Sequence, residues 1–371
     1  MLKKFVLMLV LSLHLIVIHH TPTAFAEKGP RHKVLFITES NQKTQMATKA
    51  LMLLLNDPTE KVPFITATLT ISPLGSLTYY NILEQIKSQK PTACVFLLKT
   101  HQFPSLTKIM EEEEIPSIFP WGGPVEDNLH ERAYTFYMNW NEASRFEALG
   151  IWAERKNLRK WSLIAERLDA TSRALSKEAA KKLLNEGIKD VRTFQINPND
   201  DSNLLNTLKE GRATGHGNIL AFLNPMNIIR ITTFVQKQGM QDLLITSGWE
   251  WEQTPPVEGI HVITQYPLPT EETLSWAKKH FHQDILEHIP LEQLIKAYGA
   301  AMWLSQALSL PTSTPLDVAR NLERTGALNV LGYELEVSSK THLPLEQTFS
   351  LLKRSRGKWI LEGKITLEKR Q

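Results

Sequence analysis

The stretch GNILAFLNPMNIIRITTFVQKQGMQDLLITS, residues 217–247, decides the fold class of this chain. It begins with an apolar run, GNILAFL (217–223), continues through an amphipathic segment, NPMNIIRITTFVQKQG (224–239), and ends in a second apolar run, DLLITS (242–247). Continuous apolar runs joined by amphipathic helices are typical of a parallel β-sheet that helices cover on both faces. The stretch therefore predicts one strand–helix–strand unit of an α/β fold.

The same alternation runs through two consecutive halves of the chain. In the first half, apolar runs alternate with helical segments at 33–38, 44–57, 62–71, 75–89, 93–98, 105–114 and 115–120. In the second half, helices and apolar runs precede the quoted stretch at 141–157, 161–166, 171–187, 191–196 and 201–211. The chain then changes to three helices and three short β segments, at 270–281, 291–308, 314–326, 333–337, 348–354 and 358–362. We therefore expect an α/β protein of two lobes, in which the chain returns to the first lobe near Pro267.

The first 26 residues have the pattern of a cleavable export signal. Lys3 and Lys4 precede an apolar segment at 5–18, and Ala24-Phe25-Ala26 supplies the small residues that signal peptidase requires. The apolar segment is shorter than the ~20 residues that span a membrane. We therefore expect a periplasmic protein whose mature chain begins at Glu27, and the absence of a Cys at that position argues against a lipid anchor.

Charge and cysteine content exclude several classes of function. Loss of the leader reduces Lys+Arg from 42 to 40 against 39 Asp+Glu, which leaves a net charge of about +1. Such a balance does not attract nucleic acid, so we expect no nucleic-acid partner. Cys94 is the one cysteine and lies within an apolar run, ACVFLL (93–98), where a buried structural thiol is expected.

Five segments of the chain resemble the type I periplasmic solute-binding proteins of branched-chain amino acid and amide uptake systems, the leucine-binding-protein-like family. Their order and spacing match the family over nearly the whole mature chain. The segments are KIMEEEEIPSIFPWGG (108–123), ERAYTFYMNWNEASRFEALGIWAERKNLRKWSLIAE (131–166), GNILAFLNPMNIIRITTFVQKQGMQDLLITSGW (217–249), VEGIHVITQYP (257–267) and AYGAAMWLSQAL (297–308).

The resemblance implies two α/β lobes joined by three crossing segments, with a ligand held in the cleft between the lobes. On this pattern the crossings fall near Tyr137–Asn139, Tyr266–Pro269 and Leu331–Tyr333. The expected units are a signal peptide at 1–26, lobe one at 27–138, lobe two at 139–266, a return to lobe one at 267–331 and a return to lobe two at 332–371.

Candidate ligand-binding residues follow the predicted strand ends, because open parallel sheets bind ligands outside the carboxyl ends of their strands. In the family, hydroxyl and amide groups of the first lobe hold a ligand carboxylate and an acidic residue of the second holds its ammonium; the positions of Thr100 and Gly122 match the first role. The candidates are Glu39, Ser40, Lys99, Thr100, Trp121, Gly122, Asp169, Asn224, Trp249 and Glu250.

Two departures from the family pattern leave the ligand open. Lys99 and Thr100 replace a Gly-Pro or Gly-Ser pair, and Glu250 stands two positions after the expected acidic residue. A lysine suits an anionic group, while Trp121 and Trp249 offer flat apolar surface for a ring or alkyl body. Alternatively, Trp249 and Trp251 pin a loop to the body of the protein and contact no ligand.

Patterns of catalytic or metal chemistry are weak. Ser105 and Lys108 form an S-x-x-K pattern without its partner motifs, so Ser105 is more simply a helix cap. His280 and His282 stand two residues apart on a predicted helix and point to different sides. We expect no catalytic residue, metal or cofactor. The acidic run at 111–114 is interpreted as a solvated face or a docking patch.

The function expected from the sequence is capture of a small ligand in the periplasm by a monomer that delivers it to an inner-membrane ABC permease. The alternative is a periplasmic ligand sensor, or a carrier of lipid or hydrophobic ligands, on the same fold. An enzyme ranks third. Because a fold does not fix a function, this expectation rests on the resemblance.

Overall fold

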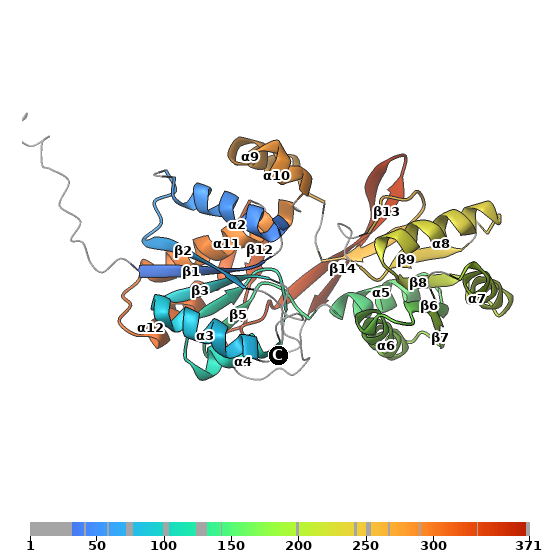
Figure 1. Ribbon diagram of the computed structural model, residues 1–371, viewed down its shortest axis with the longest axis horizontal. Coiled ribbons are helices and arrows are strands. Elements are labelled where there is room, and N and C mark those ends of the chain that lie inside the picture. Colours follow the sequence, from blue (N-terminus) through green and yellow to red (C-terminus); the bar gives the residue numbers. More distant parts are fainter. Residues whose placement is uncertain are drawn as a thin grey trace, which may run out of the picture.

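The chain folds into two α/β lobes that lie side by side along the long axis of the molecule (Figure 1). The computed structural model describes residues 32–40, 42–57, 59–71, 77–98, 104–123, 132–141, 143–197, 200–240, 243–249, 254–265, 268–288, 291–331 and 333–368. The predicted export signal and the start of the mature chain at Glu27 lie outside these residues.

Lobe one contains a five-stranded parallel sheet with the strand order β2-β1-β3-β4-β5. Its strands are β1 (His32–Glu39), β2 (Phe64–Ile71), β3 (Ala93–Leu97), β4 (Ser117–Phe119) and β5 (Thr135–Tyr137). Helices of this lobe are α2 (Gln42–Leu55), α3 (Leu77–Gln89), α4 (Pro104–Glu112), α9 (Glu271–His280), α10 (Gln283–His288), α11 (Leu291–Leu308) and α12 (Pro315–Arg324).

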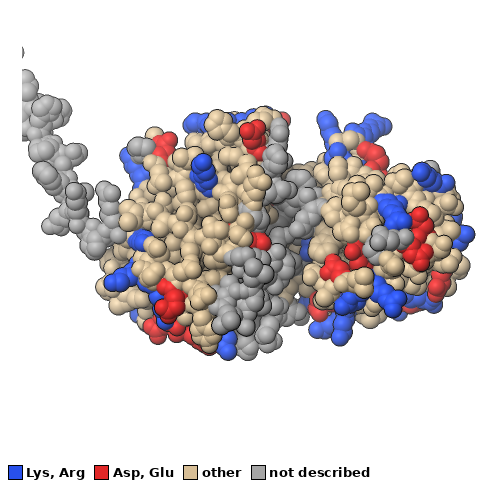
Figure 2. Space-filling view, viewed as in Figure 1, with Lys and Arg blue, Asp and Glu red and all other residues tan. Residues whose placement is uncertain are grey.

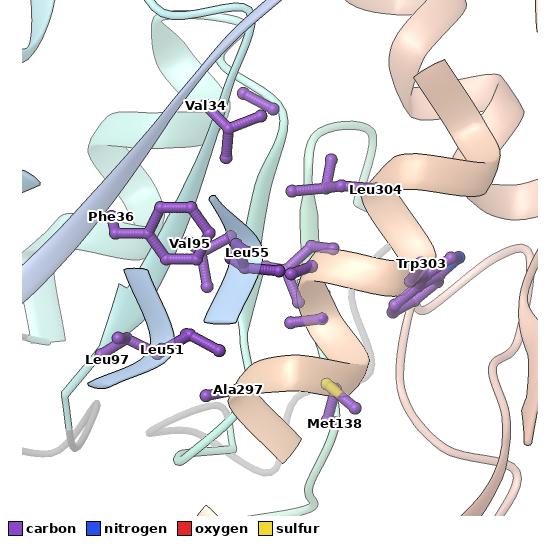
Figure 3. Close-up of a cluster of buried hydrophobic side chains, with 14 of the residues drawn as sticks. Val34, Phe36, Leu51, Leu55, Val95, Leu97, Met138, Ala297, Trp303 and Leu304 are labelled. Carbon is purple, nitrogen blue, oxygen red and sulfur yellow. The ribbon is translucent and has the colours of Figure 1, made fainter. Parts of the chain in front are cut away.

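Strand β1 shows why helices cover both faces of this sheet. Val34 and Phe36 point into a core with α2 and α11, and Figure 3 shows them together with Leu304 of α11. Leu35 and Ile37 point into the opposite core with α3 and α4. Side chains alternate between the two faces of a strand, so a continuous apolar run fills both cores. Cys94 lies in the second core, where burial raises the pKa of its thiol, which agrees with the predicted structural role.

Lobe two contains a seven-stranded sheet with the order β14-β13-β10-β9-β8-β6-β7. Five strands are parallel, and β13 and β14 extend the sheet as an antiparallel pair. The strands are β6 (Lys160–Glu166), β7 (Asp190–Ile196), β8 (Asn218–Phe222), β9 (Leu244–Ser247), β10 (His261–Thr264), β13 (Glu346–Ser355) and β14 (Lys358–Glu368). The helices are α5 (Ser144–Arg155), α6 (Ala170–Asn185), α7 (Asp201–Ala213) and α8 (Pro225–Lys237).

The third crossing between the lobes lies farther along the chain than the sequence places it. The segment expected to begin the return to lobe two, β12 (Tyr333–Glu336), pairs instead with β11 (Ala327–Val330) in a small antiparallel sheet. Leu335 and Leu343 pack in the cores of lobe one. The chain therefore enters lobe two only where β13 begins, and residues 333–343 belong with lobe one.

The acidic run at 111–114 has a role that its sequence did not reveal. The Glu111 carboxylate accepts hydrogen bonds from the backbone N–H groups of Ala133 at 3.0 Å, Tyr134 at 3.2 Å and Thr135 at 2.8 Å. It also accepts one from the Thr135 hydroxyl at 2.5 Å. Glu111 therefore fixes the start of β5 and is not a solvated surface residue as predicted.

Replacing Glu111 with alanine should destabilise the protein by about 2–3 kcal/mol, because hydrogen bonds to a charged group contribute about 1.5–3 kcal/mol and here several amides lose one shared partner. Denaturant unfolding measures this loss. Glu112→Ala is the matched control, since Glu112 is exposed and its carboxylate pairs with the ammonium of Lys108 at 3.7 Å on the same helix. Equal stability of the two variants would show that Glu111 does not hold β5.

The described surface carries charges of both signs on both lobes. On the face shown in Figure 2, Lys and Arg side chains lie among Asp and Glu side chains, and no single-sign patch of described residues covers either lobe. No helix within the described ranges is long and apolar enough to cross a membrane.

Candidate ligand-binding site at the lobe junction

The carboxyl ends of the parallel strands in both lobes face the junction between the lobes. In lobe one, β5 is parallel to its neighbours, and after Tyr137 the chain crosses into lobe two. In lobe two, β10 is parallel to β9, and after Thr264 the chain leads back to lobe one. Because parallel strands end at the same edge of their sheet, the two ligand-binding edges are directed toward each other across the crossings.

Each sheet also contains a switch point, where the strand order reverses. In lobe one it lies between β1 and β3, and in lobe two between β6 and β8. Ligands of open α/β sheets bind outside the carboxyl ends of the strands at such points, where the flanking loops diverge and leave room. We therefore expect ligand contacts from the loops that follow these four strands.

The predicted residues of lobe one divide between the edge and the core. Glu39 ends β1, and Ser40 is exposed just beyond it, with its backbone N–H donating to the Ile71 carbonyl at 2.7 Å. Trp121 follows β4, but its ring is only 4% exposed and packs in the lobe-one core. Its Nε1 donates to the Gln293 carbonyl at 2.7 Å, so the ring anchors the β4 loop to α11. Gly122 is buried beside it.

Lys99 and Thr100, the two predicted polar contacts after β3, lie outside the described residues. Their roles in holding an anionic or polar end of a ligand stay predictions.

The predicted polar residues of lobe two cap helices at its ligand-facing edge. Asp169 precedes α6, and its carboxylate accepts a hydrogen bond from the Thr171 N–H at 2.9 Å. Asn224 precedes α8, and its side-chain oxygen accepts one from the Asn227 N–H at 3.0 Å. Side-chain oxygens at these positions satisfy amides that the first helical turn leaves unpaired. Both residues lie at the switch point, where their side chains serve as helix caps.

Glu166 at the end of β6 joins these elements and was missed by the sequence. Its carboxylate accepts hydrogen bonds from the Asn224 N–H at 2.6 Å and the Asn227 side-chain amide at 3.0 Å. Its own backbone N–H donates to the Ser172 hydroxyl at 2.9 Å, which donates in turn to the Phe222 carbonyl. Glu166 therefore positions the start of α8 against β6. Its position as the last residue of an apolar strand is the sequence feature that could have identified it as a candidate.

Trp249 is attached to the end of β8. Its indole Nε1 donates to the Leu223 carbonyl at 2.7 Å, and its backbone N–H donates to the Ser247 hydroxyl at 3.0 Å. The ring is half-buried against the core between the sheet, α7 and α8. A Cβ on Gly248 would meet the Phe222 ring at 2.3 Å, so glycine permits this close approach. The loop is pinned at Trp249, while Glu250 and Trp251 lie outside the described residues.

The first crossing is tied to the β4 loop and to α11. The Asn139 amide donates to the Pro120 carbonyl at 2.8 Å, and its oxygen accepts a hydrogen bond from the buried Lys296 ammonium. A Cβ on Gly123 would lie 1.9 Å from the Trp140 carbonyl oxygen. The loop that carries Trp121 and Gly122 is therefore held directly against the crossing.

Gln347 connects all three crossings. Its side-chain oxygen accepts a hydrogen bond from the Trp140 N–H at 2.5 Å, and its side-chain nitrogen donates to the Gln265 side-chain oxygen at 2.9 Å. The Trp140 indole donates to the Pro344 carbonyl at 2.6 Å. These residues stand on crossings one, two and three, so a rotation of one lobe against the other must move the three segments together.

Comparison with known proteins gives matches at the level of structure. A comparison with protein-family models found no match, and a comparison with curated proteins found none. A leucine-binding protein from Thermotoga maritima matches with a TM-score of 0.68 at 15% identity, over 90% of this chain and 98% of that one. A branched-chain amino acid transporter substrate-binding protein from Streptococcus pneumoniae, in complex with isoleucine, matches with a TM-score of 0.69 at 13% identity, over 91% and 100%.

A third match is a solute-binding protein of an ABC transporter from R. palustris in complex with benzoate, with a TM-score of 0.65 at 16% identity, over 90% of this chain and 96% of that one. Matches at identities this low establish the fold alone. The chain has the two-lobed α/β fold of type I periplasmic binding proteins, as the sequence predicts.

Proposed function

We propose that this protein captures a small ligand at the junction of its lobes and delivers it to an ABC-type permease. The observation that supports this most is the convergence of two switch-point edges on one junction spanned by three crossings. A ligand that contacts both edges stabilises the closed arrangement, and no covalent step is required. Structures similar to this chain include a leucine-binding protein and a solute-binding protein of an ABC transporter, which supports the proposal.

The proposed setting is the periplasm, with the chain acting as a monomer after removal of its leader. The export pattern of residues 1–26 supports this setting. N-terminal sequencing of the protein from the cell envelope should begin at Glu27, and an intact Met1 would contradict it.

A thermal-shift screen tests ligand capture. Purified mature protein is heated with amino acids, amides, aromatic acids and sterol-like lipids in separate wells. A ligand that binds the folded state alone stabilises it by about 2.7 kcal/mol at a hundredfold excess over its Kd, so the melting temperature should rise for one chemical class. No shift with any compound would contradict ligand capture. A lipid as the one hit would favour the carrier function over amino acid uptake.

A further inference from the structure

The most exposed large apolar side chains of the described residues lie on the two edges that face the junction. They are Leu168 at 87% exposure, Tyr80 at 75% and Met226 at 74%. Leu168 stands in the turn after β6, Tyr80 in the first turn of α3 after β2, and Met226 in the first turn of α8 after β8. Because these side chains stand where the strand ends of the two lobes face each other, they are available to contact the apolar part of a ligand.

Leu168 and Met226 belong to neighbouring segments of the lobe-two switch point. Glu166, two residues before Leu168, accepts hydrogen bonds from Asn224 and Asn227, which flank Met226. The bonds fix the β6 turn against the start of α8. The two apolar side chains therefore stand on a rigid part of the edge and not on separate loops.

The charged groups at this edge differ in how available they are to a ligand. Glu166 is buried and its carboxylate is engaged by Asn224 and Asn227, while the Asp169 carboxylate caps α6. Arg167 is exposed beside Leu168, and its carbonyl accepts a hydrogen bond from the Arg173 guanidinium. The exposed Arg167 is therefore available to an anionic ligand group, whereas the carboxylates of Glu166 and Asp169 already accept hydrogen bonds from the protein.

We propose that the ligand is an organic acid with an apolar body, and that Leu168 and Met226 cover that body from lobe two while Tyr80 covers it from lobe one. Arg167 attracts its carboxylate. This inference rests on the proposed function and narrows it, because it assigns lobe two an apolar and cationic surface. A free α-amino acid would place its ammonium group against that surface.

Matched pairs of probes test the ligand class. Isocaproate is leucine without its ammonium group, and hydrocinnamate is phenylalanine without its ammonium group. Titration calorimetry should give at least tenfold tighter binding for the acid than for the amino acid in one of the pairs. Isocaproamide, which lacks the anionic charge, should bind more weakly than isocaproate.

Polar replacements of similar shape test the residues. Leu168→Asn and Met226→Gln should each weaken binding of the tighter acid by roughly tenfold, the effect of losing most of one buried apolar side chain. Leu53→Asn is the control, since Leu53 is 69% exposed but lies in the last turn of α2, at the opposite end of lobe one. It should leave affinity unchanged. Arg167→Gln should weaken isocaproate and spare isocaproamide.

Several outcomes would overturn the inference while leaving ligand capture intact. One is an amino acid or a polar amide such as glutamine that binds while both acids fail. A second is normal binding of the tighter acid to both Leu168→Asn and Met226→Gln. A third is equal weakening of polar and apolar ligands by these variants, which would assign the apolar pair to contact between the lobes. Loss of binding to every class in the screen would instead contradict the proposed function itself.

Discussion

Replacing Trp140 with alanine should lower the free energy of unfolding by about 3–5 kcal/mol, the usual cost of truncating a fully buried aromatic side chain. Trp140 is 2% exposed and packs in the core of lobe two. Its indole also donates to the Pro344 carbonyl at 2.6 Å. The substitution therefore opens a cavity in lobe two and releases crossing three from crossing one. Denaturant unfolding followed by circular dichroism measures the loss.

Two further variants separate packing from tethering at this position. Trp140→Phe keeps most of the ring and removes the bond to Pro344, so it should cost about 1–3 kcal/mol, the penalty for a buried carbonyl left unpaired. Trp152→Ala is the control, because Trp152 lies on α5 at the margin of the same core and is only partly buried. If Trp140→Ala costs no more than Trp152→Ala, Trp140 does not join the crossings.

Replacing Gly123 with alanine should both destabilise lobe one and weaken ligand binding. The added Cβ would lie 1.9 Å from the Trp140 carbonyl oxygen and 2.6 Å from the Asn141 nitrogen, both of them backbone atoms. Backbone cannot rotate out of the way as a flexible side chain can, so the β4 loop must move off the crossing. Overpacking of this kind costs about 1–3 kcal/mol or more. Unfolding and ligand affinity are measured on the same sample.

Gly363→Ala is the matched control for Gly123→Ala. Gly363 lies in β14 with open space where a Cβ would stand. It should leave affinity unchanged and stability equal or slightly raised, since alanine reduces the entropy of the unfolded chain. Wild-type affinity in Gly123→Ala would show that the β4 loop and the crossing are not coupled.

The fold could be predicted from the sequence wherever the pattern within one segment indicates how that segment is buried. In β1, four consecutive apolar residues predict burial on both faces, because successive side chains of a strand point to opposite faces of the sheet. This prediction requires no knowledge of the residues that pack against the strand. The same holds for the β8–α8–β9 unit, whose apolar runs and amphipathic helix are local patterns. Fold class and lobe order were therefore predictable.

Side chains whose roles depend on a distant partner were not predictable. Glu111 stands in an acidic run, and only the folded chain brings the β5 amides to it from 22 to 24 residues away. Trp121 follows the end of a strand, where a ligand contact is expected, yet its ring packs in the core of lobe one with residues of α11. The sequence of β12 predicts a strand but does not indicate which lobe contains it. Its pairing with β11 places it in lobe one.

X-ray scattering in solution tests the central claim, that a ligand binds between the two edges and draws the lobes together. The sample is the mature protein with and without the compound that raises its melting temperature most. A junction ligand predicts a smaller radius of gyration in the complex, because contacts to both edges favour the closed arrangement. A tightly bound compound that leaves the scattering curve unchanged would contradict the account, since it would place the ligand in a site that a single lobe provides.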